Sequence, residues 1–332
     1  MSKHTIQHFD GIPGLDLGPY MRGEPGAIDF LAEAFREVEQ EVGFLYIDNH
    51  GVPPEAIERA FAASKRFHTM PLERKREIPL NRDNVGYMGL NASMQKHSKV
   101  EVARKPNYNE SFFAKRDRKA DDPDVLAGKP FRGLNQWPRD LPGFREDVVA
   151  YQHALERLGM KMLPIVARSL ALQDDFFDAY FDPAQYTLRL LHYPVRDEAE
   201  PEQFGTGAHT DGGFMTFLIQ NGVGGLQIRK SDGTWFDAPV LPGKYLVNSG
   251  DMMRRWTNDR YLSTAHRVMN VSGVDRYSLA FFFDPHPDRV MTCLPTCTDA
   301  DNPPKHAPIT YGQYLTEFLD ANYFHRKNAE PA

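Results

Sequence analysis

The sequence has few cysteines, no excess of basic residues and no long apolar run, and each lack excludes a class of protein. Two cysteines, Cys293 and Cys297, cannot form a disulfide framework, which favours a reducing compartment and a cytoplasmic location. With 39 basic and 45 acidic residues the net charge is −6, which argues against a general nucleic-acid-binding protein. The N-terminus lacks a secretory pattern, and no uncharged stretch is long enough to cross a bilayer. These absences predict a cytoplasmic protein without nucleic-acid or membrane partners.

The N-terminal part of the chain predicts helices around one strand. Apolar residues recur at helical spacing over residues 28–42, and this pattern predicts an amphipathic helix. An apolar strand follows at residues 43–47, and a second helix at 56–67. Residues 80–140 are expected to be irregular, with a solvated loop at the mixed charge run of residues 115–124.

The texture changes in the second half of the chain. A long helical pattern over residues 143–172 precedes a series of short apolar runs separated by Gly, Pro and Asp. These runs lie at residues 187–193, 214–219, 225–228, 245–247, 266–268 and 277–283. Short strands with such punctuation predict a sandwich or barrel. We therefore expect a mainly β core with flanking helices, a helical N-terminal region and a final helix at about 311–324.

Three residues of the β half are candidate metal ligands. In Gly207-Ala208-His209-Thr210-Asp211, an extended backbone would point His209 and Asp211 to the same side. A further histidine, His266, lies on a predicted strand after several others, so the chain has room to return to the same point. Two imidazoles and one carboxylate form the facial triad of iron(II) oxygenases, which leaves coordination positions open for a chelating 2-oxo acid and for O₂.

A basic and hydroxylic pair follows the second histidine. On a strand, Arg276 and Ser278 share one face while Tyr277 points away. A guanidinium beside a hydroxyl suits a distal carboxylate that needs paired hydrogen bonds and one more donor. This pair predicts a site for the far carboxylate of 2-oxoglutarate.

Ordered motifs along most of the chain carry a family resemblance. In the C-terminal half these are His209-Thr210-Asp211, Gly224-Gly225-Leu226-Gln227, Asn248-Ser249-Gly250-Asp251, His266-Arg267-Val268 and Arg276-Tyr277-Ser278. In the N-terminal half they are Gly43-Phe44-Leu45-Tyr46-Ile47, Asn49-His50-Gly51 and Asn135-Gln136-Trp137-Pro138. With these motifs the chain resembles the isopenicillin N synthase-like family of 2-oxoglutarate/iron(II)-dependent dioxygenases.

The resemblance implies a double-stranded β-helix (jelly-roll) core and a set of site residues. Iron(II) would be bound by His209, Asp211 and His266, and 2-oxoglutarate by Arg276, Ser278 and Tyr193. The family's motif of Asn-Tyr-Tyr-Pro type reads Leu191-His192-Tyr193-Pro194 here, so the phenol is kept and one polar contact is lost. The implied reaction uses O₂ to oxidise, most often to hydroxylate, a small organic substrate, and it releases succinate and CO₂.

The resemblance also suggests how the chain is divided. We expect a helical and mixed N-terminal region at residues 1–140, a supporting helix at 141–180, the double-stranded β-helix core at 181–290 and a C-terminal extension with a helix at 291–332. The protein is expected to be a monomer or a weak homo-oligomer.

Several further residues are interpreted from their surroundings. His50 is expected to be a turn or packing residue, and Arg189 a buried partner of a carboxylate. Tyr87 and the segment Asn107-Tyr108-Asn109 are candidate substrate contacts. The run Phe281-Phe282-Phe283 is expected to pack in the core, with one of the three a candidate for lining the substrate pocket.

Other functions remain open at this point. An oxidase of the isopenicillin N synthase type would use the same triad without 2-oxoglutarate. A metal-dependent hydrolase could use the triad to activate water, although Arg276 and Ser278 would then be unexplained. A jelly-roll binding protein without activity would not need all the ligands that this sequence keeps.

Overall fold

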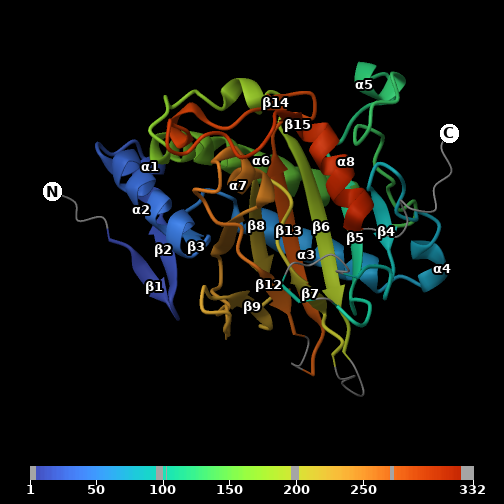
Figure 1. The fold of residues 1–332 in the computed structure, drawn as a ribbon. Coiled ribbons are helices and arrows are strands. Elements are labelled where there is room, and N and C mark those ends of the chain that lie inside the picture. The colour runs from blue at the N-terminus through green and yellow to red at the C-terminus, as the bar shows by residue number, and fades with distance from the viewer. Residues whose placement is uncertain (1–4, 95–99, 102, 196–201, 270–272, 323–332) are drawn as a thin grey trace.

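Two facing β-sheets with three long helices on one outer side form the molecule (Figure 1). The computed structural model describes residues 5–94, 100–101, 103–195, 202–269 and 273–322. Apolar side chains from both sheets meet between them, among them Phe44, Tyr46, Leu191, Ile228 and Val268. This arrangement is the jelly-roll core that the family resemblance implies.

The larger sheet has nine strands in the order β1-β2-β3-β11-β8-β13-β6-β5-β4. Their bounds along the chain are Gln7–Phe9 (β1), Ile12–Asp16 (β2), Phe44–Asp48 (β3), Gly86–Met88 (β4), Glu110–Lys115 (β5), Gln185–Tyr193 (β6), Met215–Gln220 (β8), Tyr245–Ser249 (β11) and Arg276–Asp284 (β13). The longest pairing joins β13 to β6 in antiparallel register, with Arg276 opposite Tyr193 and Asp284 opposite Gln185.

The smaller sheet has four strands in the order β10-β9-β12-β7. These strands are Thr206–His209 (β7), Leu226–Arg229 (β9), Trp235–Asp237 (β10) and His266–Val268 (β12). A separate two-stranded ribbon is formed by Val290–Met291 (β14) and Ile309–Thr310 (β15).

Three long helices cover the outer face of the larger sheet. They are Ala27–Glu41 (α2), Pro54–His68 (α3) and Phe144–Ser169 (α6), and they bury Phe35, Phe67 and Leu155 against the sheet. Shorter elements are Gly18–Met21 (α1), Leu72–Lys75 (α4), Pro123–Leu126 (α5), Asp251–Trp256 (α7) and the 3₁₀ turns Asp178–Tyr180 and Pro295–Cys297. The C-terminal helix is Tyr311–Asn322 (α8). None of the helices in the described part of the chain combines the length and apolarity that a membrane span needs.

Alternation along β13 separates two environments. Phe281 and Phe283 are buried in the core beneath the helices, whereas Phe282 points to the inner side and lines a cavity. Arg276 and Ser278 share that inner side because side chains two apart on a strand point the same way. Of the three phenylalanines, Phe282 is thus the one that lines a cavity, and its place in the substrate pocket stays a prediction.

The middle of the chain differs from the expectation. Residues 80–140 include β4 and β5, and β5 pairs with β6 inside the larger sheet. Lys115 ends β5 and is buried, and the side chain of Arg118 is only 8% exposed. The prediction of an irregular region was therefore wrong for β4 and β5, and pairing with β6 draws Lys115, the start of the charge run, into the sheet. The expected solvated loop is found at residues 116–122, which form no helix or strand and are exposed at residues 119–121.

Candidate functional site

The three predicted ligands converge at one end of the smaller sheet. His209 ends β7 and His266 begins β12, and the two are cross-strand neighbours. Asp211 follows two residues after His209, and its Oδ1 lies 3.7 Å from the Nε2 atom of each histidine. One ligand atom from each of the three lies within 4.8 Å of the others. Such a cluster can hold one divalent ion.

Hydrogen bonds orient His209 and Asp211 toward this point. The Nδ1–H of His209 donates to the carbonyl of Gly207 at 2.9 Å, which leaves Nε2 directed at the cluster. The other carboxylate oxygen of Asp211, Oδ2, accepts from Thr216 at 2.7 Å and Asn248 at 2.8 Å. Oδ1 is thereby left for a metal.

The charge states also suit metal binding. The pKa of His209 is lowered to about 4, mainly by burial and next by the charge of the neighbouring His266. Burial acts to raise the pKa of Asp211, but the adjacent histidines and the hydrogen bonds from Asn248 and Thr216 lower it overall. A neutral imidazole and an ionised carboxylate are the forms that coordinate a metal.

Close backbone packing fixes the loop that carries Asp211. The amide of Asp251 donates to the carbonyl of Asp211 at 2.7 Å. A Cβ added to Gly250 would lie 2.4 Å from the carbonyl oxygen of Gly213, and one added to Gly213 would lie 2.3 Å from Asp284. Both glycines are therefore needed for this approach.

Arg276 is a buried cation whose partners are neutral. Its guanidinium donates to Gln220 Oε1 at 2.7 Å and to Ser278 Oγ at 3.5 Å, and it lies 4.6 Å from the ring centre of Tyr193. Among the described residues, its Nε has no hydrogen-bond partner and no acid forms an ion pair with it. Burial lowers the pKa of Arg276. A buried charge in this state is costly unless an anion joins it, so the site fits a carboxylate.

The neighbours of Tyr193 explain the altered motif. Tyr193 is buried, and its hydroxyl lies 3.1 Å from Thr206 Oγ1. Leu191 points to the same inner side, opposite Ser278. His192 points to the other side of the sheet, where its Nδ1 hydrogen-bonds Glu110 at 2.8 Å. Of the two substitutions, the one at Leu191 therefore removes a polar group from the inner side.

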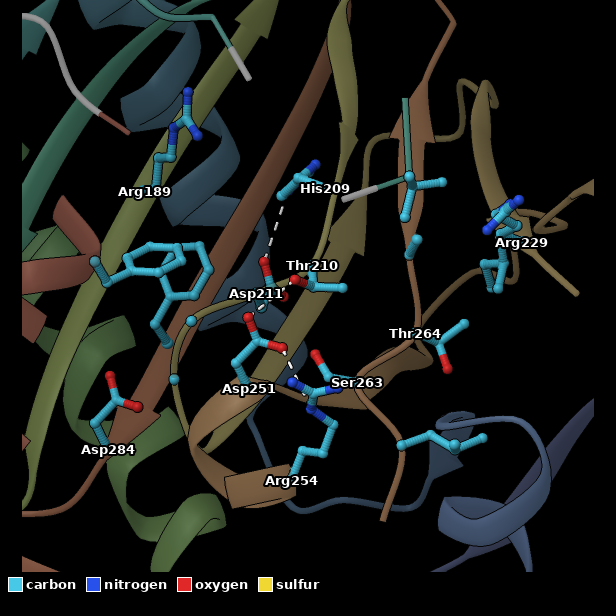
Figure 2. Close-up of a pocket in the computed structure, with 18 of the residues that line it drawn as sticks. Arg189, His209, Thr210, Asp211, Arg229, Asp251, Arg254, Ser263, Thr264 and Asp284 are labelled. Atoms are coloured by element: carbon cyan, nitrogen blue, oxygen red, sulfur yellow. Dashed lines mark hydrogen bonds and ion pairs between the residues drawn. The ribbon is translucent and has the colours of Figure 1, made fainter. Parts of the chain in front are cut away.

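A cavity of about 950 Å³ opens beside the cluster (Figure 2). His209 and Asp211 line it, together with polar residues of the larger sheet, the start of α7 and apolar residues of α8. Among these lining residues are Lys115, Thr187, Arg189, Arg229, Asp251, Arg254, Phe282, Asp284, Leu315, Phe318 and Leu319. A molecule in this cavity would contact the ligand end of the site directly.

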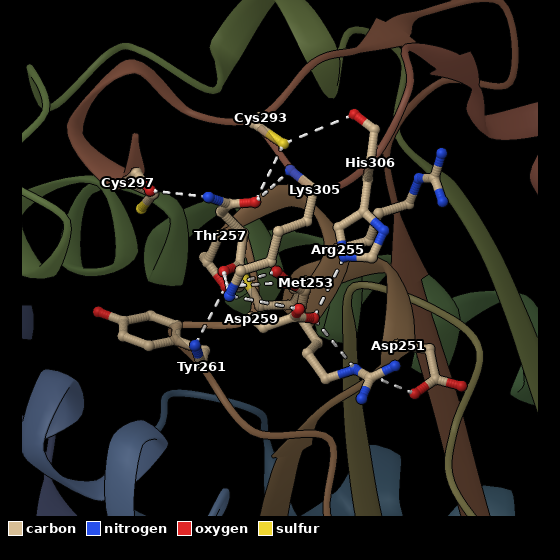
Figure 3. Close-up of polar contacts among 12 residues, drawn as sticks. Asp251, Met253, Arg255, Thr257, Asp259, Tyr261, Cys293, Cys297, Lys305 and His306 are labelled. Atoms are coloured by element: carbon tan, nitrogen blue, oxygen red, sulfur yellow. Dashed lines mark hydrogen bonds and ion pairs between the residues drawn. The ribbon is translucent and has the colours of Figure 1, made fainter. Parts of the chain in front are cut away.

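A polar cluster behind α7 supports the cavity wall (Figure 3). Asp259 lies 3.8 Å from Arg254, 3.6 Å from Lys305 and 3.2 Å from His306. Both cysteines are free, and the Cys293 thiol lies 3.6 Å from Asn258 Oδ1. This cluster ties the α7 end to the segment before α8.

Four other interpretations meet different outcomes. Tyr87 is buried, donates to Glu110 at 2.5 Å and does not line the cavity, so its expected substrate contact was wrong. Asn107 and Asn109 do not line it either, and they bond to the backbone of residues 205–207 before His209. His50 is a packing residue, with Nε2 bonded to the carbonyl of Gly243 at 2.8 Å. The carboxylate partner expected for Arg189 was wrong, because its hydrogen bonds go to Ser111 and Asn109.

Sequence profiles match two parts of the chain. The profile of the 2OG-Fe(II) oxygenase superfamily matches residues 184–285, which include every predicted ligand. The profile described as non-haem dioxygenase in morphine synthesis N-terminal matches residues 12–140.

Full-length relatives agree with these profiles. The chain is 38% identical to the 2-oxoglutarate-Fe(II) type oxidoreductase hxnY of Emericella nidulans, over 96% of this chain and 94% of that protein. It is 32% identical to kihadalactone A synthase LFS of Citrus sinensis, over 95% of each chain. A full-length Neurospora crassa protein crystallised with alpha-KG superposes with a TM-score of 0.83 and 29% identity, covering 95% of this chain and 98% of the other. That Neurospora crassa protein has also been crystallised with alpha-KG and thymine together.

Proposed function

The chain belongs to the 2OG-Fe(II) oxygenase superfamily, and we propose that His209, Asp211 and His266 bind iron(II) while Arg276, Ser278 and Tyr193 bind 2-oxoglutarate. The protein is a 2-oxoglutarate/iron(II)-dependent dioxygenase that oxidises a small organic molecule. Its proposed reaction is hydroxylation, in which substrate R–H, O₂ and 2-oxoglutarate give R–OH, succinate and CO₂.

The donor set supports the choice of metal. Two imidazole nitrogens and one carboxylate oxygen on one side of an ion leave the other side open, as in non-haem iron(II) oxygenases. Bound iron(II) would supply the activation of O₂ that the side chains cannot provide. Hydrogen bonds with Gly207, Thr216 and Asn248 orient the side chains of His209 and Asp211 for iron. The cavity beside these two residues would hold the substrate.

The observation that carries the co-substrate assignment is Arg276. It is 1% exposed, its Nε lacks a partner, and the groups that do bond to it are neutral. A metal-dependent hydrolase does not need a buried cation of this kind. The relatives that are named for 2-oxoglutarate likewise support its use over an oxidase reaction without it.

Anaerobic titration tests the assignment. Protein loaded with iron(II) and titrated with 2-oxoglutarate should develop a weak visible charge-transfer band. Arg276→Ala should raise the 2-oxoglutarate concentration needed by about tenfold or more, because a charged hydrogen-bonded partner is lost. Arg229→Ala, which removes an arginine that lines the cavity, should leave the titration unchanged. An unaltered titration for Arg276→Ala would refute the anchor.

Two product measurements separate the alternatives. Succinate should appear in step with oxidised product; product without succinate would favour the oxidase. Turnover with zinc and without O₂ would favour the hydrolase.

We propose a cytoplasmic monomer or weak homo-oligomer that does not bind nucleic acid. Net charge of −6 and free cysteines support this setting. The division at residues 140, 180 and 290 stays a prediction.

A further inference from the structure

The cavity is lined by several cations, and most of them have an acid close by. Arg254 lies 3.9 Å from Asp251 and 3.8 Å from Asp259. Lys115 donates to Thr187 at 2.7 Å and interacts electrostatically with Asp284. Lys230 interacts electrostatically with Asp232. For Arg189 and Arg229, no ion pair with an acid is found in the described chain. These two arginines are therefore the candidates for an anion that comes from outside.

Arg189 differs from Arg229 in being held in place. Its Nε donates to Ser111 at 2.9 Å, one terminal nitrogen donates to Asn109 at 3.0 Å, and its guanidinium lies 4.9 Å from the ring centre of Phe113. All three partners are neutral, so the positive charge is fixed without being compensated. A charge fixed in this way in a half-buried site is ready for a carboxylate.

The position of Arg189 separates it from the proposed co-substrate anchor. It lies four residues before Tyr193 on β6, which is about 13 Å along a strand. Tyr193 is opposite Arg276, whereas Arg189 is opposite the small side chain of Ala280. Figure 2 shows Arg189 on one side of the cavity and Arg229 on the other, with His209 and Asp211 between them. An anion at Arg189 would thus lie beside the metal ligands and away from Arg276.

The other walls of the cavity are suited to the apolar part of a bound substrate. Phe318, Leu315 and Leu319 of α8 line it, and Phe282 lines it from β13. The ring of Phe318 lies against the backbone of Gly212, where an added Cβ would be 2.8 Å from three ring carbons. The apolar wall therefore begins one residue from Asp211.

We infer that the substrate is a small organic acid, with its carboxylate on Arg189 and its apolar body along Phe282 and Phe318. This inference rests on the proposed function, since it names the substrate class of the same site. Hydroxylation would take place on the apolar body, because the carboxylate is held to one side of the metal ligands.

Matched pairs of acids and amides test the inference. Monocarboxylic acids with aromatic or aliphatic bodies would be compared with their primary carboxamides, beginning with benzoate and benzamide. The readout is stimulated O₂ uptake and succinate formation by the enzyme loaded with iron(II) and 2-oxoglutarate. We expect an acid to exceed its amide about tenfold or more in kcat/KM, because the amide leaves the guanidinium without its ion pair.

Substitutions assign the preference to Arg189. Arg189→Gln should abolish the preference for the acid, Arg189→Lys should retain part of it, and the matched Arg229→Gln should leave it intact. The anaerobic 2-oxoglutarate titration of Arg189→Gln should stay within about twofold of the parent, which also shows that the site has folded.

Three results would overturn the inference. The first is that no acid of the panel stimulates O₂ uptake, and the second is that acids and amides stimulate it equally. The third is that the preference for the acid remains in Arg189→Gln. A tenfold weaker 2-oxoglutarate titration of Arg189→Gln would instead make Arg189 a co-substrate residue. Failure of the parent protein to bind iron(II) and 2-oxoglutarate at all would refute the proposed function itself.

Discussion

The second oxygen of Asp211 determines how well this carboxylate can serve as a ligand. Thr216 and Asn248 both donate to Oδ2, so the side chain cannot rotate away from the two histidines without losing two hydrogen bonds. We predict that Asn248→Ala and Thr216→Val each weaken iron(II) affinity about 10- to 100-fold, as is usual for groups that orient a metal ligand. Competition with a chromogenic chelator would measure the iron(II) affinity of each variant.

Ser249, which follows Asn248 on β11, provides a control for the iron(II) affinity. Ser249 bonds to Glu39 and to the carbonyl of Leu262, away from the ligands. Ser249→Ala should leave iron(II) affinity unchanged. Full affinity in a Thr216→Val/Asn248→Ala double variant would contradict the role given to these hydrogen bonds.

Glu39 is a buried acid that gives the fold a pH dependence. Burial raises its pKa to about 8, although the hydrogen bond from Ser249 acts in the opposite direction. Between the unfolded value of 4.5 and about 8, the folded state keeps a proton that the unfolded state has lost, so stability falls as the pH rises. We predict that Glu39→Gln stabilises the protein by about 2–4 kcal/mol at pH 8 and by much less at pH 5. Urea unfolding at both pH values would measure this, and an equal effect at both would contradict it.

Some site residues could be predicted from the sequence because their geometry is local. His209 and Asp211 are two apart on an extended segment, and so are Arg276 and Ser278. Thr216 and the neutral partners of Arg189 could not be predicted, because they depend on which strands become neighbours. No local spacing in the sequence predicts that Arg189 on β6 will donate a hydrogen bond to Ser111 on β5.

One buried carboxylate connects four secondary-structure elements. Glu110 on β5 accepts from Lys75 of α4 at 2.8 Å, from Tyr87 of β4 at 2.5 Å and from His192 of β6 at 2.8 Å. Burial acts to raise the pKa of Glu110, but His192, His68, Lys75 and Tyr87 lower it to about 2. Its contribution to stability is therefore present above pH 4.5 and is lost as the pH falls toward 2.

Breaking this network should be costly. We predict that Glu110→Gln destabilises the protein by about 3–5 kcal/mol at pH 7, because the Lys75 ammonium stays buried without its acid. The double variant Lys75→Met/Glu110→Gln should cost less than the two single changes together. Urea unfolding measures each value, with Glu24→Gln in the exposed pair with Arg22 as a control of small effect. Strictly additive costs would contradict the coupling.

The same network explains why β5 was not predicted. A strand is indicated by apolar alternation, yet β5 begins with Glu110 and ends with Lys115, both of which are buried. Their partners come from α4 and β6, which are 35 and 72 residues away. Elements with an apolar periodicity of their own, such as α2, α6 and β13, were predictable because burial of one face needs no specific distant partner.

At the scale of the whole molecule, the proposed site spans both sheets. His209 and His266 come from the smaller sheet, whereas Arg276 and Tyr193 come from the larger one. A 2-oxoglutarate molecule that chelates iron and reaches Arg276 would therefore bridge the two layers of the jelly roll. Each ligand stabilises the folded state by mass action, and a ligand held by both layers should also couple the two binding events.

We therefore predict that iron(II) and 2-oxoglutarate together raise the free energy of unfolding by more than the sum of their separate effects. The excess should be about 1–3 kcal/mol, the usual range of coupling between two ligands. Unfolding by urea under anaerobic conditions, with each ligand alone and with both, measures it. His209→Ala should remove the excess while keeping the small effect of 2-oxoglutarate alone, because Arg276 is intact in that variant. Additive effects in the parent protein would mean that the co-substrate does not bridge the layers, and would place its binding site elsewhere than between Arg276 and the three ligands.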